Sequence, residues 1–125
     1  MARLTIRIDI GDEAALGPGK MRLLELIDTK GSIRRAASAM GMSYRRAWLL
    51  VKDIENVMGA PVIFAETGGA NGGGAALTEL GRAVVARYRS IEDRASRSVD
   101  AELRALSQMA RPRNASSKKK FAKRV

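Results

Sequence analysis

Three glycines, at positions 31, 41 and 59, divide the first half of the chain into short segments that each have helical periodicity. Within every segment the apolar residues recur at spacings of three and four, which is the period of one helix face. A glycine directly after such a pattern is typical of a helix C-terminus, because glycine adopts the left-handed backbone without strain. The expected helices are 20–30, 33–40 and 43–58.

The second and third expected helices are separated by a tight glycine-containing turn, and a serine stands at the start of each. Ser32 and Ser43 are good N-caps, because a serine hydroxyl accepts a hydrogen bond from a free backbone N–H of the first turn. Ala36 and Ala37 are small enough to let two helices cross closely. The arrangement predicts a helix-turn-helix over 32–58.

The third expected helix has one apolar face, which we assign to the core. Its residues are Ala47, Leu50 or Trp48, Val51, Ile54 and Met58. Trp48 is the single tryptophan of the chain, and we expect it to pack in the core rather than to contact a partner. The second helix is expected to bury Ile33, Ala36, Ala37 and Met40.

A glycine-rich hairpin follows the third helix directly. Residues 61–66 are expected to form a strand opened by proline, 67–74 hold five of the twelve glycines, and 75–78 form the return strand. Helix, turn, helix and hairpin in this order predict a winged helix-turn-helix domain over 1–77, with its wing at 61–77. A nucleotide phosphate loop fits poorly, because no Gly-Lys-Ser/Thr sequence follows the glycines.

The two ends of the chain have patterns of their own. Residues 4–10 alternate apolar and polar side chains, which predicts a half-buried strand. From Leu80 to Leu106 an apolar stripe at helical spacing predicts one long helix over 78–110, capped by Thr78. Residues 111–125 are rich in lysine, serine and arginine, and we expect a disordered basic tail there.

So long a helix cannot bury its whole stripe against a domain of this size, so we expect the same helix of a second copy to cover the rest. The chain is therefore predicted to be a homodimer. The residues expected at the dimer interface are Leu80, Val84, Tyr88, Ile91, Ala95, Val99 and Leu103. The predicted fold class is mainly α with a small β component, a winged helix-turn-helix followed by a long C-terminal dimerisation helix.

The net charge of +10 is unevenly distributed. Seven of the 23 basic residues lie in 111–125 without any acidic residue, so the remainder of the chain is nearly balanced. Between Thr29 and Lys52, however, the sequence has basic residues and no acidic one. Basic charge concentrated on one segment of a balanced chain is typical of a surface that binds nucleic-acid phosphates, although a solvated helix face explains the charge equally well.

The chain contains neither cysteine nor histidine. It therefore lacks thiol chemistry, disulfides, the usual zinc ligands and the commonest general base. No carboxylate cluster or activated nucleophile stands out either, so we expect no enzymatic activity. The N-terminus does not resemble a signal peptide, and no apolar run is long enough to span a bilayer, so we expect a cytoplasmic protein without a membrane partner.

The motifs quoted next resemble a known bacterial family. They are Gly31-Ser32-Ile33 with Ala36, Gly41-Met42-Ser43-Tyr44-Arg45 with Ala47-Trp48, Thr67-Gly68-Gly69, Gly72-Gly73-Gly74, Leu77-Thr78 and Gly81. Over about residues 18–90 the chain resembles the N-terminal domain of ModE-type molybdate-responsive regulators, and more distantly the LysR-type DNA-binding domains. The resemblance implies a DNA-binding dimer that uses its third helix and its wing.

Complete ModE proteins carry C-terminal oxyanion-binding domains, and nothing after residue 110 has the length to form one. We therefore expect a DNA-binding version without a fused molybdate-sensing domain, with no cofactor and no bound molybdate. The partner is expected to be double-stranded DNA. The residues expected to bind it are Ser32, Arg34, Ser43, Tyr44, Arg45, Arg46, Lys52, Thr67, Gly68, Gly69, Asn71 and Gly72.

Arg45 and Arg46 carry most of this expectation, because they follow a helix cap and project away from the apolar face. Tyr44 fits a phosphate contact or a packing role equally well. The leading hypothesis is sequence-specific transcription regulation at an inverted repeat, and we favour a repressor. The alternative is an architectural protein that binds DNA with low specificity, and an oxyanion-binding module is a third possibility.

Overall fold

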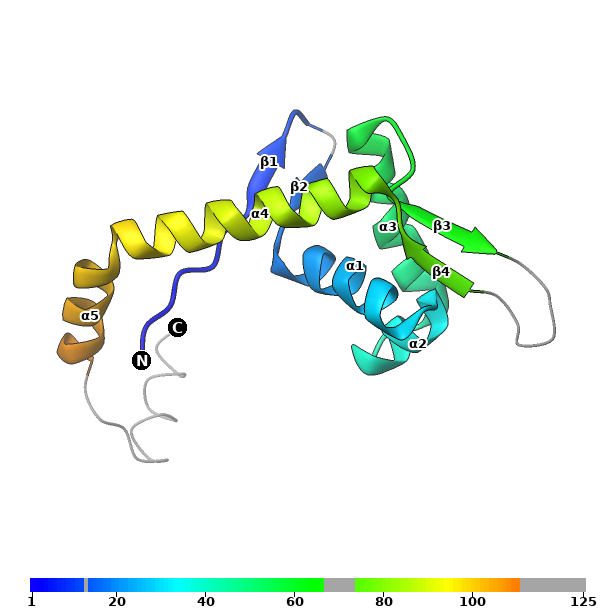
Figure 1. Ribbon diagram of the computed structural model, residues 1–125. Coiled ribbons are helices and arrows are strands. Elements are labelled where there is room, and N and C mark those ends of the chain that lie inside the picture. Colours follow the sequence, from blue (N-terminus) through cyan, green and yellow to red (C-terminus); the bar gives the residue numbers. More distant parts are fainter. Residues whose placement is uncertain (13, 67–73, 111–125) are drawn as a thin grey trace. The chain divides into compact units, whose positions relative to one another are not determined.

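The computed structural model describes residues 1–12, 14–66 and 74–110. The described part is mainly helical with two small antiparallel hairpins (Figure 1), which confirms the expected mixture of helix and strand. In chain order the elements are β1 (Ile8–Ile10), β2 (Ala14–Leu16), α1 (Pro18–Lys30), α2 (Ile33–Ala39), α3 (Tyr44–Met58), β3 (Ile63–Glu66), β4 (Gly74–Leu77), α4 (Glu79–Ser98) and α5 (Asp100–Met109). The chain divides into a main part, Thr5–Arg94, and a second part made of Met1–Leu4 and the chain from Ala95 onward.

The first three expected helices are confirmed to within two residues at each end. α1 ends at Gly31, which has a φ of 76° and whose N–H donates to the carbonyl of Ile27 at 2.9 Å. Gly41, in the turn between α2 and α3, also has a positive φ, of 70°. A side chain is strained in this backbone region, so glycine at both positions favours a sharp change of direction.

The core of the main part lies between α1, α2, α3 and the inner side of α4 (Figure 1). Ala36 and Ala37 of α2 are buried as expected, and so are Ala47, Val51 and Ile54 of α3. The largest fully buried side chains are Tyr88, Met21, Leu23, Leu24, Ile27, Ile54, Val51 and Val62. Branched and straight aliphatic side chains supply most of this core, which is consistent with its helical composition.

The strand expected over 4–10 is shorter in the structure, where β1 covers Ile8–Ile10. The predicted alternation is nevertheless present, because Leu4 and Ile6 are half-buried while Arg3, Thr5 and Arg7 are exposed. β1 pairs antiparallel with β2, a strand that we did not predict because 11–19 suggested only turns. With three residues in β2, the hairpin cannot pair the whole of 4–10.

The hairpin expected after α3 is confirmed. β3 pairs antiparallel with β4, with Ile63 opposite Leu77 and Phe64 opposite Ala76. The glycine-rich segment between these strands, residues 67–73, lies outside the described residues, as does the expected tail at 111–125.

The single helix expected over 78–110 is interrupted at Val99, which has φ −117° and ψ 16°. α4 ends at Ser98, whose hydroxyl donates to the carbonyl of Ala95 at 2.8 Å. A serine that bonds its own helix backbone in this way competes with the regular helical hydrogen bonds. Asp100 and Glu102 then place acidic charge in the first turn of α5, where the helix dipole favours it.

Candidate nucleic-acid interface

The N-termini of α2 and α3 are both closed by the serines that the sequence identified. The Oγ of Ser32 accepts a hydrogen bond from the backbone N–H of Arg35 at 3.0 Å. The Oγ of Ser43 accepts the corresponding bond from Arg46 at 3.1 Å. A hydroxyl that accepts such a bond keeps its own hydrogen for an outside acceptor. Both caps are therefore confirmed, and each can still donate to a phosphate.

Arg34 and Tyr44 connect the starts of these two helices. The guanidinium carbon of Arg34 lies 5.1 Å from the centre of the Tyr44 ring, within the range of a cation–π interaction. Tyr44 is 43% exposed, so it belongs to the surface rather than to the core. The structure thus brings together two residues that the sequence had placed ten positions apart in one candidate site.

Arg45 and Arg46 are exposed at the beginning of α3. The next residue, Ala47, is completely buried, and Val51 and Ile54 extend the same buried face. The two arginines therefore project into solvent from an anchored helix. Because the sequence from Thr29 to Lys52 contains no acidic residue, their charge is not offset by near neighbours in the chain.

Trp48 is placed differently from the expectation. Its side chain is 42% exposed, and the Nζ of Lys52 lies 5.3 Å from the centre of its ring. The prediction of a core tryptophan was wrong because the narrow buried face of α3 is already filled by Ala47, Val51 and Ile54. The core therefore has no space for the Trp48 ring, which lies on the side of α3 next to the buried face.

Lys52 is also more constrained than the sequence suggested. Its Nζ forms an ion pair with Oε1 of Glu55 at 3.0 Å. The other oxygen of Glu55 accepts a hydrogen bond from the backbone N–H of Val62 at 2.9 Å. Lys52 is thus held between a carboxylate and the Trp48 ring, while its side chain remains 45% exposed.

Leu49 is an exposed apolar residue of α3 that sequence reasoning passed over. Its side chain is 44% exposed, similar to those of Tyr44 and Trp48 on the same helix. The sequence could have predicted this exposure. Leu49 lies two residues after Ala47 and two before Val51, and on a helix such a position faces away from the buried side.

The β3–β4 hairpin is anchored to the helices at its base. The N–H of Ala75 donates to the carbonyl of Gly31 at 2.8 Å, next to the N-terminus of α2. The N–H of Leu77 donates to Oδ1 of Asp28 at 3.1 Å. These bonds place the described base of the hairpin beside the α2–α3 unit. The expected contacts at Thr67, Gly68, Gly69, Asn71 and Gly72 lie outside the described residues.

Thr78 and Gly81 join the hairpin to α4. The hydroxyl of Thr78 donates to the carbonyl of Pro61 at 2.9 Å and accepts from the N–H of Gly81 at 3.0 Å. A Cβ at Gly81 would lie 2.1 Å from the carbonyl oxygen of Val62. Glycine is therefore required here by a close backbone approach rather than by an unusual φ.

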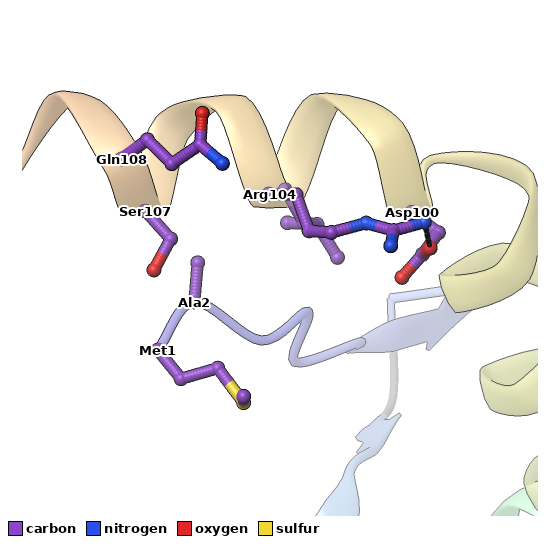
Figure 2. A pocket seen from close by; sticks show the side chains of 7 residues that line it. Met1, Ala2, Asp100, Arg104, Ser107 and Gln108 are labelled. Carbon is purple, nitrogen blue, oxygen red and sulfur yellow. Dashed lines mark hydrogen bonds and ion pairs between the residues drawn. The ribbon is translucent and has the colours of Figure 1, made fainter.

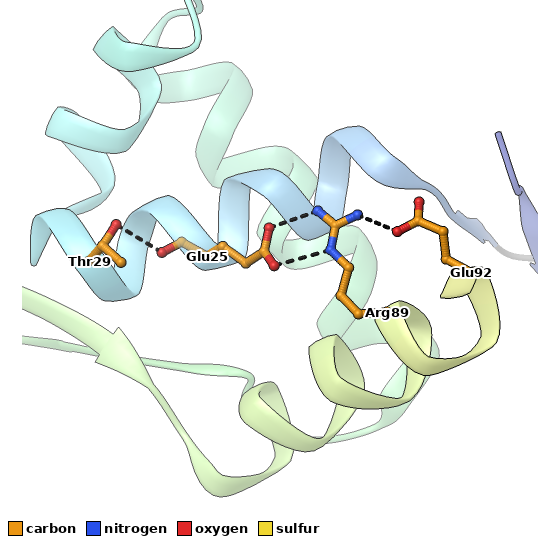
Figure 3. Close-up of polar contacts among 4 residues, drawn as sticks. All are labelled: Glu25, Thr29, Arg89 and Glu92. Atoms are coloured by element: carbon orange, nitrogen blue, oxygen red, sulfur yellow. Dashed lines mark hydrogen bonds and ion pairs between the residues drawn. The ribbon is translucent and has the colours of Figure 1, made fainter. Parts of the chain in front are cut away.

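An ion-pair cluster joins α4 to α1, as Figure 3 shows. Arg89 donates to both carboxylate oxygens of Glu25, at 2.7 and 3.1 Å, and to Oε1 of Glu92 at 2.8 Å. The hydrogen bond from Arg89 holds the pKa of Glu25 below its ordinary value, against an opposing effect of burial. The same bond raises the pKa of Arg89.

Burial raises the pKa of the neighbouring Tyr88, whose hydroxyl donates to the carbonyl of Ile6 at 2.6 Å.

The residues expected at a dimer interface have different surroundings. Val84 and Tyr88 are 8% and 1% exposed, because they pack in the core of the chain itself. Burial leaves them almost no surface for a partner, which corrects their assignment. Leu80 also packs against this core, whereas Ile91 is 46% exposed. Ala95, Val99 and Leu103 are half-buried.

The second part of the chain contains a shallow hollow of about 350 Å³ (Figure 2). It is lined by Met1, Ala2, Asp100, Leu103, Arg104, Ser107 and Gln108. The side chains of Asp100 and Arg104 form an ion pair, so their charges largely cancel in this hollow.

In the described ranges, no group of three acidic, histidine or cysteine side chains lies close enough to hold a metal ion. The helices in those ranges are also too short or too polar to cross a membrane.

Comparison with known proteins identifies the class of relatives. No family model matches the chain. Among curated proteins, it is 40% identical over 92 residues to the molybdenum transport protein ModE of Azotobacter vinelandii, which is 74% of this chain and 33% of that protein. It is 32% identical over 89 residues to the transcriptional regulator ModE of Haemophilus influenzae, covering 71% of this chain and 35% of the relative.

A third relative is the molybdenum-pterin-binding protein MopB of Rhodobacter capsulatus, with 43% identity over 79 residues, 63% of this chain and 29% of that protein. The chain is therefore homologous to ModE proteins over about 70% of its length. It spans about a third of the length of the curated relatives that it matches. The resemblance to ModE proteins inferred from the sequence motifs is thereby confirmed.

Proposed function

We propose that this chain is a winged helix-turn-helix module of a transcription regulator and that it binds duplex DNA. In this proposal α2 and α3 form the helix-turn-helix, the β3–β4 hairpin is the wing, and the N-terminal half of α3 enters the major groove. The observation that carries the proposal is the start of α3. Ser43 caps a helix that is anchored by Ala47 and presents Arg45 and Arg46 to solvent.

The surrounding geometry supports docking on a phosphate backbone. The capped N-terminus of α2 presents Arg34 beside Tyr44, and the wing base is bonded to Gly31 just before it. A helix N-terminus favours phosphate because its free N–H groups and dipole attract anions. Arginine suits the groove itself, since its two parallel donors match the acceptors of guanine. Homology to ModE regulators points to the same role.

We further propose that the chain acts as a homodimer on an inverted repeat, with repression as the favoured outcome. Ile91 is the large apolar side chain of α4 that is exposed, and a second copy would cover it. A dimer would place two copies of α3 on one face of the duplex, which matches the symmetry of an inverted repeat. MopB is named as a molybdenum-pterin-binding protein, and we do not propose that binding activity for this chain.

The test is selection of duplexes from a random library, followed by binding measurements over a range of salt concentrations. We expect a consensus containing an inverted repeat. Replacing Arg45 and Arg46 together by alanine should lower affinity for that consensus by at least about 30-fold, since a good arginine–base contact contributes about 1–3 kcal/mol. The matched control is Arg7→Ala with Arg104→Ala, which removes the same charge from side chains that are 76% and 73% exposed.

Equal losses in both double variants would mean that only net charge matters. That result, together with a library that yields no consensus, would favour the second candidate, an architectural protein of low specificity. The observation in its favour is the excess of basic charge, with 23 basic against 13 acidic residues. Charge-driven binding of this kind weakens steeply with salt.

A further inference from the structure

Leu49 lies at the centre of the outward face of α3. Ala47 and Val51, each two residues away, are 0% and 1% exposed. Because successive residues rotate by about 100° around an α-helix, a position between two such buried neighbours faces the opposite side. The exposed fraction of Leu49, 44%, agrees with this orientation.

The helix neighbours of Leu49 are all charged. Positions three and four residues away on a helix lie beside one another, and here they are Arg45, Arg46, Lys52 and Asp53, every one of them exposed. Lys52 is held by Glu55 and by the Trp48 ring. Leu49 is thus an aliphatic side chain surrounded by charge, on a helix whose core contacts are made by the opposite face.

We propose that Leu49 is a specificity-determining residue that contacts the C5-methyl group of a thymine. This inference rests on the proposed function, which places α3 in the major groove. The groove edges of the four bases present hydrogen-bond donors, acceptors and one apolar group, the thymine methyl. An aliphatic side chain at the centre of a charged face complements that group, while Arg45 and Arg46 one turn earlier complement guanine or phosphate.

The contact distinguishes T·A from C·G at one position of each half-site. Cytosine offers an amino donor and no methyl group at the equivalent place. A leucine cannot accept that hydrogen bond, so a cytosine there would lose its water and gain no partner. Leu49 would therefore favour thymine both by apolar contact and by exclusion of cytosine.

Single deoxyuridine substitutions in the selected consensus duplex test the inference. Each removes one methyl group and leaves base pairing intact. For the unaltered chain we expect about a fourfold loss of affinity at one symmetry-related thymine in each half-site, the effect of losing one buried methyl-sized group. Other thymines in the duplex serve as internal controls.

The same series is then measured with Leu49→Ala and with the control Asn56→Ala, which truncates an exposed side chain two turns later on α3. Leu49→Ala should bind the thymine and deoxyuridine duplexes equally, and Asn56→Ala should keep the fourfold difference. Thermal melting of Leu49→Ala should match that of the unaltered chain, because the side chain is exposed.

Each outcome decides the inference. A deoxyuridine effect that persists in Leu49→Ala assigns the methyl contact to another residue and overturns the inference while leaving the proposed function intact. If no deoxyuridine substitution changes the affinity of the unaltered chain, the inference is also overturned and the proposed function again remains intact. A library that yields no consensus overturns both the proposed function and this inference.

Discussion

Arg89 of α4 and Glu25 of α1 form a two-point ion pair, with Nη2–Oε1 at 2.7 Å and Nε–Oε2 at 3.1 Å. Glu92 holds a further donor of the same guanidinium (Figure 3). Both side chains of the pair are about one-third exposed, at 34% and 32%. The pair joins a helix that follows the hairpin to the helix that precedes the α2–α3 unit, across 64 positions of sequence.

Glu25→Gln should lower the free energy of unfolding at neutral pH by about 1 kcal/mol, the upper range for a partly exposed pair. The pKa of Glu25 in the folded chain lies below its ordinary value of 4.5, so the unfolded chain takes up the proton first as pH falls. Stability from this pair is complete above pH 4.5 and is lost through the lower folded pKa. Urea titrations should show the two proteins converging in acid, and a constant difference would contradict this assignment.

Gly81→Ala should lower the free energy of unfolding by at least about 2 kcal/mol, because its Cβ would meet the carbonyl oxygen of Val62 at 2.1 Å. The control is Gly19→Ala, where no atom lies within 4 Å of the added Cβ. That change should be neutral or slightly stabilising. Thermal melting of the two variants distinguishes a steric requirement from a general cost of losing glycine.

Ser43→Ala should lower the free energy of unfolding by about 1 kcal/mol through loss of the cap on Arg46. Ser43→Asp should restore stability, because aspartate is an equally good cap and its charge suits a helix N-terminus. The same aspartate should weaken DNA binding by repelling phosphate. Recovery of stability with loss of DNA affinity would separate the capping role of Ser43 from its role in DNA binding. Unchanged DNA affinity in Ser43→Asp would mean that the phosphate backbone of the DNA does not approach this position.

Ile91→Asp should shift the proposed dimer towards monomer in sedimentation experiments, because it replaces the exposed large apolar side chain of α4 by a charge. Ser90→Asp, at the neighbouring exposed position, is the matched control and should leave the association constant within about threefold. A dimer that survives Ile91→Asp would have to associate through other residues.

Trp48 is the single tryptophan, so its emission reports on the flank of α3 without interference. With 42% of its side chain exposed, it should be open to quenching by acrylamide in the free chain. Binding of the selected duplex should reduce the quenching constant at least about twofold, as the groove walls exclude the quencher. Unchanged quenching on a bound duplex would argue against docking by this helix.

Local signals in the sequence sufficed for α1, α2 and α3 and their ends, but not for the break between α4 and α5 at Val99. Gly31 and Gly59 end α1 and α3 with positive φ, and Ser32 and Ser43 cap α2 and α3. These features depend on a few adjacent residues, because caps and left-handed glycines satisfy backbone groups within one turn. The exposure of Arg45 and Arg46 followed in the same way from the apolar face behind them.

Tertiary structure decided the features that depend on what fills the space beside a helix. Periodicity placed Trp48 in the core and Val84 and Tyr88 in one stripe with Ile91. It does not say how wide a face of each helix the neighbouring helices cover. In the fold Trp48 lies outside, while Val84 and Tyr88 lie inside. The Arg89–Glu25 pair and the close approach at Gly81 also required the folded chain, because each joins segments far apart in sequence. Sequence alone located α1, α2 and α3 and their caps, and packing determined where α4 ends and which side chains remained free to bind.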